Sequence, residues 1–237
     1  LQLENIHDSS PYMLERLSSS YQFMAKFLSL LKRDNEAFHK ALQSVKTLDR
    51  MLLQDPENSR WVNQKYNAYF KLFTYTNSET EALVETDLAS LAANIKVDAA
   101  KDMVLNLDLV WANYHLAAAT YSGKKRNFAE SLNQAIQAKE LFLKLQKNRS
   151  TDVFSELANS MLLESKALRL MGNTAEANLV CQQTKSLLEP VLLTNKDFVY
   201  LIPFAESLSC LNEENLNSEL TSLLNKANMT HKFLNIN

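Results

Sequence analysis

Glycine and proline are scarce in this sequence, with two glycines and four prolines among 237 residues. An average globular protein contains about 7% glycine, and sheets and long functional loops draw heavily on both residue types. Their scarcity therefore predicts helices joined by tight turns. The two glycines, Gly123 and Gly172, stand far apart. Their isolation excludes a glycine-rich loop that cradles a phosphate with its backbone N–H groups.

An excess of charge of one sign is also absent, because 25 lysines and arginines nearly balance 27 aspartates and glutamates. The formal net charge of −2 at pH 7 excludes the electropositive surface typical of nucleic-acid-binding proteins. No stretch comes near the roughly 18 uninterrupted apolar residues of a membrane span, so we expect no direct membrane insertion. The sequence begins at Leu1 rather than methionine, and we expect a longer protein whose catalytic or anchoring parts precede it.

Residues that could carry catalysis or bind a metal are few. Cys181 and Cys210 each lie in an apolar helical run, which favours two buried thiols, with a disulfide between them as the alternative. The four histidines lie in separate segments without a second ligand at helical spacing, at His7, His39, His115 and His231. No nucleophile elbow is present. The sequence therefore predicts no enzyme, no cofactor and no metal site.

Apolar residues recur at helical spacing along nearly the whole chain, and β-type alternation is hard to find. This pattern predicts one all-α domain over residues 10–230, with a lead-in at 1–9 and a tail at 231–237. The first of ten expected helices begins at Ser10 and Pro11. Its expected apolar stripe consists of Leu14, Leu17, Tyr21, Met24, Phe27, Leu28 and Leu31.

Capping and breaking residues predict the bounds of the later helices. A fourth helix should begin at the capping box Ser78–Glu81, and a fifth should span about 98–121, closed by Gly123. An eighth should end at Pro190. The remaining expected spans are about 59–76 for the third helix, 151–171 for the seventh, 197–211 with a kink at Pro203 for the ninth, and 213–229 for the tenth.

Four turn-plus-helix starts can be aligned along the chain. Placing Ala37, Ala82, Ser131 and Ala177 in register gives steps of roughly 45, 49 and 46 residues, in the range of helical-hairpin repeats. A single hairpin cannot bury its apolar side, whereas a stack of hairpins buries it against neighbours. The sequence therefore predicts an α-solenoid of about five antiparallel helix hairpins.

Two segments resemble a tetratricopeptide repeat. One runs from Leu162 through the Gly172–Ala177 turn to Pro190, and the other comprises Asp34–Leu53 with the break that follows it before Trp61. The longer period is similar to repeat regions appended to bacterial signalling proteins, among them membrane-anchored serine/threonine kinases and winged-helix regulators. The resemblance implies a right-handed superhelix on the periplasmic side of a membrane-anchored protein, with the cytoplasm as the alternative compartment.

The two aromatic-rich segments, 59–76 and 98–121, are expected to be first helices of hairpins, which line the concave surface of such solenoids. Aromatic anchors there would suit a bound peptide, and the alternative is that they fill gaps between hairpins. The candidate peptide-binding residues are Lys65, Tyr69, Asn113, Tyr114 and Lys166.

The leading hypothesis is a non-catalytic scaffold that binds a protein or peptide, as the sensor or docking domain of a larger bacterial signalling protein. Two alternatives stay open. The solenoid could enclose a small ligand, such as a lipid or signalling metabolite, between its hairpins. It could instead be a dimerisation element that forms a homodimer.

Overall fold

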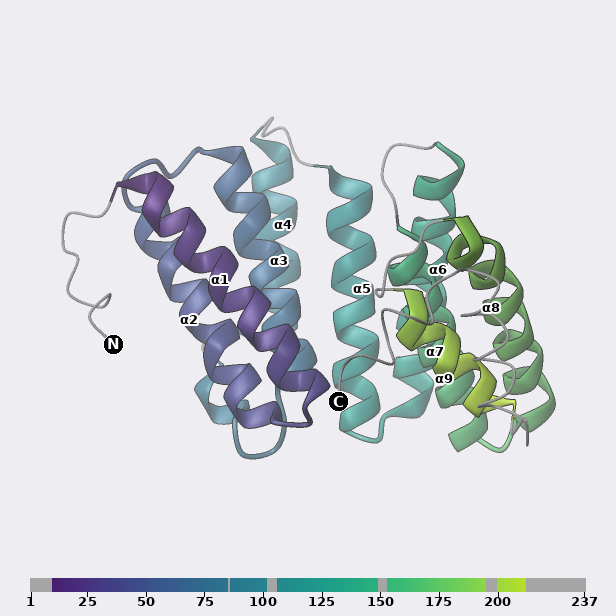
Figure 1. Ribbon diagram of the computed structural model, residues 1–237. Coiled ribbons are helices and arrows are strands. Elements are labelled where there is room, and N and C mark those ends of the chain that lie inside the picture. Colours follow the sequence, from purple (N-terminus) through teal and green to yellow (C-terminus); the bar gives the residue numbers. More distant parts are fainter. Residues whose placement is uncertain (1–9, 85, 102–105, 149–152, 195–199, 212–237) are drawn as a thin grey trace, which may run out of the picture. The chain divides into compact units, whose positions relative to one another are not determined.

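The computed structural model describes residues 10–84, 86–101, 106–148, 153–194 and 200–211 (Figure 1). Within these residues the chain is helical and has no strand, which confirms the predicted all-α class. The α-helices of this part are α1 (Pro11–Leu30), α2 (Asp34–Leu52), α3 (Ser59–Tyr75), α4 (Leu88–Ala100), α5 (Leu107–Lys124), α6 (Phe128–Lys147), α7 (Phe154–Leu170), α8 (Thr174–Thr194) and α9 (Leu201–Cys210). The predicted lead-in, tail and tenth helix lie outside the described residues.

The chain divides into two compact units, residues 1–121 and 122–237. In the first, α2 packs against α1 on one side and against α3 on the other. Three large α2 side chains with 0% exposure, Phe38, Leu48 and Met51, belong to the hydrophobic core of this packing. Side chains of α3 also form a cluster with α4 and α5. The single domain predicted over 10–230 and its superhelical handedness stay predictions.

Three of the turns between helices share one left-handed geometry. Lys32, Arg126 and Gly172 have φ angles of 60°, 59° and 91°. In each turn the following N–H donates to a carbonyl of the preceding helix at 2.9 Å, pairing Arg33 with Leu28, Asn127 with Ser122 and Asn173 with Leu168. These are the long bonds of Schellman motifs, which satisfy carbonyls that a helix end would leave unpaired.

The left-handed turns coincide with three of the four aligned positions. Ala37, Ser131 and Ala177 each lie five residues after a left-handed residue, and all three are at most 3% exposed. The fourth aligned position, Ala82, is exposed and was aligned wrongly. There the Asn77 side chain accepts hydrogen bonds from the N–H groups of Glu79 and Thr80, at 3.0 and 3.1 Å.

This side-chain turn at Asn77 competes with helix formation. The capping box Ser78–Glu81 therefore begins only the short 3-10 helix η2 (Glu81–Leu83), and the predicted fourth helix start is wrong. The α-helix instead begins at Leu88, where the Asp87 carboxylate accepts from Ser90 N at 2.7 Å. The expected fifth helix was also placed too early, because residues 98–100 end α4 and α5 begins at Leu107.

Gly123 does not close α5 as predicted, since the helix continues to Lys124 and Arg126 adopts the left-handed conformation. A Cβ at position 123 would lie 3.2 Å from Ser131 Oγ, so close approach explains this glycine better than backbone conformation does. Gly172, by contrast, has the positive φ expected of a residue just past a helix end.

In the second unit, α7 packs against α6, α8 and α9. Lys139 Nζ of α6 lies 2.6 Å from Glu164 Oε2 of α7, and Glu164 is buried. Removing either partner would leave a charge largely withdrawn from water, so this pair ties α6 to α7 specifically.

The prolines of the second unit break helices less than predicted. α8 continues past Pro190 to Thr194. The carbonyl of Ser186 loses its helical donor there, but Ser186 is exposed and water can take the donor's place. Pro203 lies in the first turn of α9, where its missing N–H is not needed.

The expectation of two free thiols is wrong, because Cys181 and Cys210 form a disulfide. Cys181 is buried on α8 and Cys210 is the last residue of α9, and α8 packs against α9, which leaves their Cα atoms 6.2 Å apart. Arg169 adds a second link, since its Nη2 donates to the Cys210 carbonyl at 2.7 Å. α9 is therefore fastened at its C-terminal end to both α7 and α8.

We expect Arg126→Gly to raise the free energy of unfolding of the second unit by about 1 kcal/mol, because glycine carries no left-handed penalty. Gly172→Ala should lower it by about 1 kcal/mol, purely through the backbone, since no atom lies within 4 Å of the added Cβ. Urea unfolding measures both changes. Lys125→Gly, one residue away without a positive φ, is the matched control and should not stabilise. If Lys125→Gly stabilised the unit as much as Arg126→Gly, the left-handed conformation of Arg126 would not be the cause.

Reduction of the disulfide should lower the unfolding free energy of the second unit by about 3 kcal/mol, because it frees a loop of some thirty residues in the unfolded chain. Urea unfolding with and without dithiothreitol measures this effect. The double variant Cys181→Ser and Cys210→Ser should be insensitive to the reductant. Identical curves for the reduced and oxidised wild type would contradict the structural role of this bond.

Candidate interaction surface

The two candidate residues on α3 are engaged in contacts within the first unit. Lys65 Nζ lies 2.6 Å from Asp49 Oδ1 and 5.8 Å from the centre of the Tyr69 ring. Its charge is thus shared between a carboxylate and an aromatic face. Tyr69 is half-buried and packs against two hydrophobic clusters of the unit. The structure therefore brings Lys65 and Tyr69 into contact with one another.

The candidates on α5, Asn113 and Tyr114, are both half-buried. The Tyr114 ring meets Trp111 edge to face at 5.4 Å and Phe70 at 6.4 Å. Through Phe70, Tyr114 belongs to the same cluster that Tyr69 contacts. Lys166 is exposed on α7, in the second unit.

Aromatic rings form a layer between α3, α4 and α5. Phe73 of α3 meets Tyr121 of α5 edge to face at 5.7 Å, and the pair of Phe70 and Tyr114 extends this contact. Leu91 and Ile95 of α4, at most 1% exposed, pack against the same rings. This packing favours the alternative interpretation of the aromatic-rich segments, in which the rings fill the space between helices.

Two tyrosine hydroxyls in this layer bind carboxylates. Tyr66 Oη donates to Asp98 Oδ2 at 2.5 Å, and Tyr121 Oη donates to Glu81 Oε1. Desolvation first, and then the bond to Glu81, raise the pKa of Tyr121 to about 12. The same causes, with Asp98 as the carboxylate, raise the pKa of Tyr66 well above its usual value. Both phenols are therefore held protonated.

These raised pKa values make part of the folding stability sensitive to alkaline pH. Because the folded pKa of Tyr121 is raised, the stability that it adds is complete below about pH 10 and is lost between about pH 10 and 12. We expect the difference in unfolding free energy between wild type and Tyr121→Phe to shrink across that window, as measured by urea unfolding. A difference that stays constant from about pH 9 to about pH 12 would contradict the protonated hydrogen bond.

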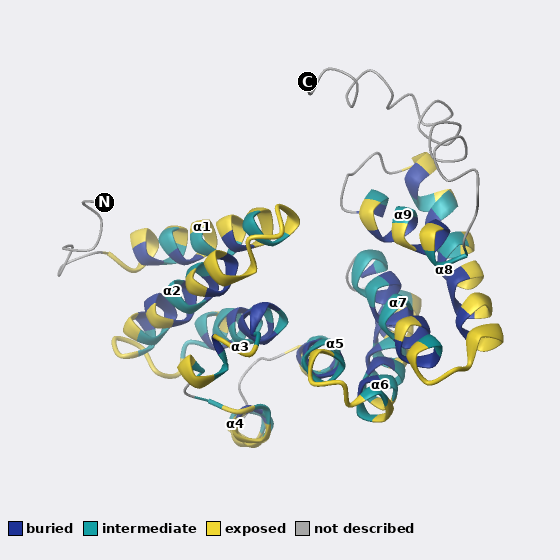
Figure 2. Cartoon of the chain, turned by 90° about the horizontal axis from the view of Figure 1, so that it is seen from below, coloured by how far each residue is buried: buried dark blue, intermediate teal, exposed yellow. Residues whose placement is uncertain are grey.

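The predicted apolar stripe of the first helix is buried only in part. Leu14 is 7% exposed, whereas Met24, Phe27 and Leu31 are 45%, 51% and 65% exposed. Figure 2 colours the chain by burial and shows many exposed residues of α1 in yellow. The buried side of α1 is centred instead on two small residues, Ser18 and Ala25, at 2% and 0% exposure. The prediction was wrong for three of its seven positions because these small side chains let α2 approach closely.

A hydrogen bond marks this close approach, since Ser18 Oγ lies 2.8 Å from Ser44 Oγ of α2. The opposite side of α1 is exposed and largely apolar. We call it the outer face and define it as Tyr12, Met13, Arg16, Ser19, Ser20, Phe23, Met24, Phe27, Leu30 and Leu31. None of its residues was among the candidates.

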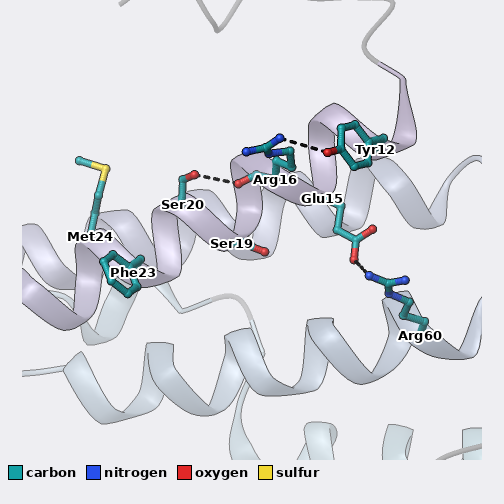
Figure 3. A pocket seen from close by; sticks show the side chains of 8 residues that line it. All are labelled: Tyr12, Glu15, Arg16, Ser19, Ser20, Phe23, Met24 and Arg60. Atoms are coloured by element: carbon teal, nitrogen blue, oxygen red, sulfur yellow. Dashed lines mark hydrogen bonds and ion pairs between the residues drawn. The ribbon is translucent and has the colours of Figure 1, made fainter. Parts of the chain in front are cut away.

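Part of the outer face borders a hollow of about 690 Å³ (Figure 3). Its lining residues are Tyr12, Glu15, Arg16, Ser19, Ser20, Phe23, Met24 and Arg60. The two small serines lie at the middle, with Arg16 toward one end and Phe23 toward the other. At the edge toward α3, Arg60 Nη2 donates to Glu15 Oε1 at 2.5 Å. All lining residues except Glu15 are exposed, so the hollow is open to water.

Intramolecular contacts hold the large side chains of the outer face in place. The Phe23 and Phe27 rings meet edge to face at 4.8 Å. Arg16 Nη1 donates to Tyr12 Oη at 3.0 Å, and its guanidinium carbon lies 5.6 Å from the Tyr12 ring centre. The face is therefore partly organised before any partner arrives.

The sequence does carry a signal for this face. At 100° per residue, Tyr12, Phe23 and Leu30 point to the side of the helix opposite Leu14 and Leu28. A helix with large apolar residues on opposite sides cannot bury both sides against one neighbour. The stripe predicted from sequence merged the two sides into one.

The described residues contain no cluster of three or more His, Cys, Asp or Glu side chains suited to a metal ion. Within the same parts of the chain, no helix has the length and apolar character needed to cross a membrane. No protein-family model matches the chain, and no curated protein or solved structure shows significant similarity to it.

Proposed function

We propose that this chain is a non-catalytic protein-binding module and that the outer face of α1 is its docking surface. The observation that carries the proposal is the row of large apolar side chains left in water along one helix. Tyr12, Phe23 and Leu31 are each more than 60% exposed. Monomeric soluble proteins rarely leave a contiguous apolar patch of this kind without an interaction to cover it.

The chemistry of the outer face suits a protein partner. Interface hot spots are enriched in Tyr, Trp and Arg, and Tyr12 and Arg16 already contact one another here. The pair of Phe23 and Phe27 supplies apolar area at helical spacing, as in partners that dock one helix along another. A partner that covers these side chains gains affinity from apolar burial and specificity from Arg16.

A membrane surface and a small ligand fit this face less well. Amphipathic helices that lie in a membrane carry their basic residues on the polar side, whereas Arg16 lies within the outer face, between Tyr12 and Phe23. A small-molecule site encloses most of its ligand. The hollow beside α1 is open, so a small ligand would keep much of its surface in water.

The wider architecture and context belong to the same proposal. We infer a right-handed, tetratricopeptide-like solenoid that serves as the sensor or docking part of a larger bacterial signalling protein, on the resemblance of the Gly172 turn region and of Asp34–Leu53. The disulfide between Cys181 and Cys210 supports an oxidising compartment such as the periplasm. Lys65, Tyr69, Asn113 and Tyr114 of the first unit and Lys166 of the second remain predicted peptide-binding residues.

Selection of displayed helical peptides against the immobilised wild-type chain tests the docking surface. We expect the recovered peptides to lose at least about tenfold in affinity on Phe23→Glu or Phe27→Glu, because each change places a charge where apolar area is buried. Val97→Glu, which changes an apolar side chain 54% exposed on α4, is the matched control and should leave affinity unchanged.

Folding of the variants is checked by urea unfolding. The two phenylalanines are exposed, so both variants should stay within about 0.5 kcal/mol of the wild type. Phe38→Ala, at a position with 0% exposure, should instead cost about 3–5 kcal/mol. Peptides that bind the Phe23 and Phe27 variants as well as the wild type, or a selection that recovers none, would overturn the proposal. So would binding of the wild-type chain to vesicles rather than to peptides.

A further inference from the structure

We infer that the occupant of the outer face is a second copy of this chain, docked with its α1 antiparallel to the first. The inference rests on the proposed docking function and adds the identity of the partner. It follows from the uneven distribution of side chains along the outer face, together with the position of its charge and of the hollow.

The outer face has two unlike halves. Its three small or polar residues, Arg16, Ser19 and Ser20, all lie in the first half, beside the exposed Tyr12 and Met13, whereas the second half consists of large apolar side chains alone. Phe23 and Phe27 are the largest of these, at 64% and 51% exposure. The two serines lie at the middle of the 690 Å³ hollow, which Phe23 and Met24 border at one end (Figure 3). A surface with a cation and small residues in one half and only large apolar side chains in the other is complementary to itself after a half-turn.

An antiparallel arrangement uses this complementarity twice, once on each side of the two-fold axis. With the two outer faces overlapping along their full length, Ser20 faces Phe23 of the second copy. Large side chains thus enter the space left by small ones. Arg16 comes opposite Phe27 of the second copy, where a guanidinium over a ring face is favourable.

A parallel arrangement lacks these contacts. It would bring Arg16 against Arg16 of the second copy and would leave the serines facing one another across the hollow. It would also place equal ends of the helix dipoles side by side, whereas antiparallel helices place opposite ends together. Charge and shape therefore both select the antiparallel pair.

The size of the surface sets the strength of the pair. α1 has 20 residues, a length of about 30 Å at 1.5 Å per residue. One face of one such helix supplies less than the roughly 800 Å² per partner of a standard stable interface. We therefore expect a reversible dimer that forms with rising concentration, in the micromolar range typical of smaller interfaces.

A charge exchange across the proposed contact between Arg16 and Phe27 tests partner and register together. Sedimentation equilibrium of the wild-type chain from about 1 μM to about 1 mM should show a monomer–dimer equilibrium. Phe27→Lys sets a lysine against Arg16 of the second copy and should weaken the dimer by about 30-fold. Arg16→Glu loses the contact with the ring and should weaken it as well.

Mixing the two variants should restore the dimer. In the mixed pair one contact sets the carboxylate introduced by Arg16→Glu against the ammonium introduced by Phe27→Lys, and the other keeps Arg16 against Phe27. The dissociation constant should therefore return to within about threefold of the wild-type value. Urea unfolding of each variant confirms that it is folded. Val97→Lys, at an exposed apolar position on α4, is the control and should dimerise as the wild type does.

Each other outcome overturns the inference in a recognisable way. A wild-type chain that stays monomeric at every concentration removes the second copy as partner, while recovered peptides that require Phe23 would leave the docking function intact. Dimers that persist in both variants locate self-association elsewhere. Variants that are monomeric and stay so when mixed exclude the antiparallel register.

Discussion

The close packing of α1 on α2 is the constraint on which the rest of this account depends. Ser18 and Ala25 are small enough for the two helices to approach until Ser18 and Ser44 share a hydrogen bond of 2.8 Å. A helix that turns its small residues inward must turn its large ones elsewhere. Tyr12, Phe23 and Phe27 therefore remain in water, and the same packing that stabilises the first unit creates its exposed apolar face.

The aromatic layer between α3, α4 and α5 shows the opposite arrangement, because its large side chains are packed between helices. Between α3, α4 and α5 the rings of Phe70, Phe73 and Tyr114 pack together and fill the space between the helices. Two of the tyrosines in this layer keep their hydroxyls satisfied by carboxylates at its edge. Aromatic residues in this chain thus occur in two settings. In α3 and α5 they fill the space between helices, and in α1 they lie on an exposed surface.

Local signals in the sequence predicted the helical class and three of the four aligned turns, because those signals act within a few residues. For example, Ala37, Ser131 and Ala177 are each buried five residues after a left-handed residue, a spacing set within a single turn. The start at Ser78 failed because Asn77, one residue earlier, binds the N–H groups that a helix would use. The disulfide was only the alternative to two buried thiols, because the pairing depends on which helix lies next to which and periodicity alone does not specify a neighbour. The outer face was missed because the predicted stripe merged two sides of α1.

Hydroxyl-radical footprinting of Phe23, Met24 and Phe27 across a dilution series tests the central claim most directly. We expect these side chains to be oxidised readily in dilute protein and protected in concentrated protein, while Leu53, exposed at the end of α2, is oxidised equally in both. Protection at every concentration would mean that the chain covers its own α1. Oxidation at every concentration would mean that no second copy docks there.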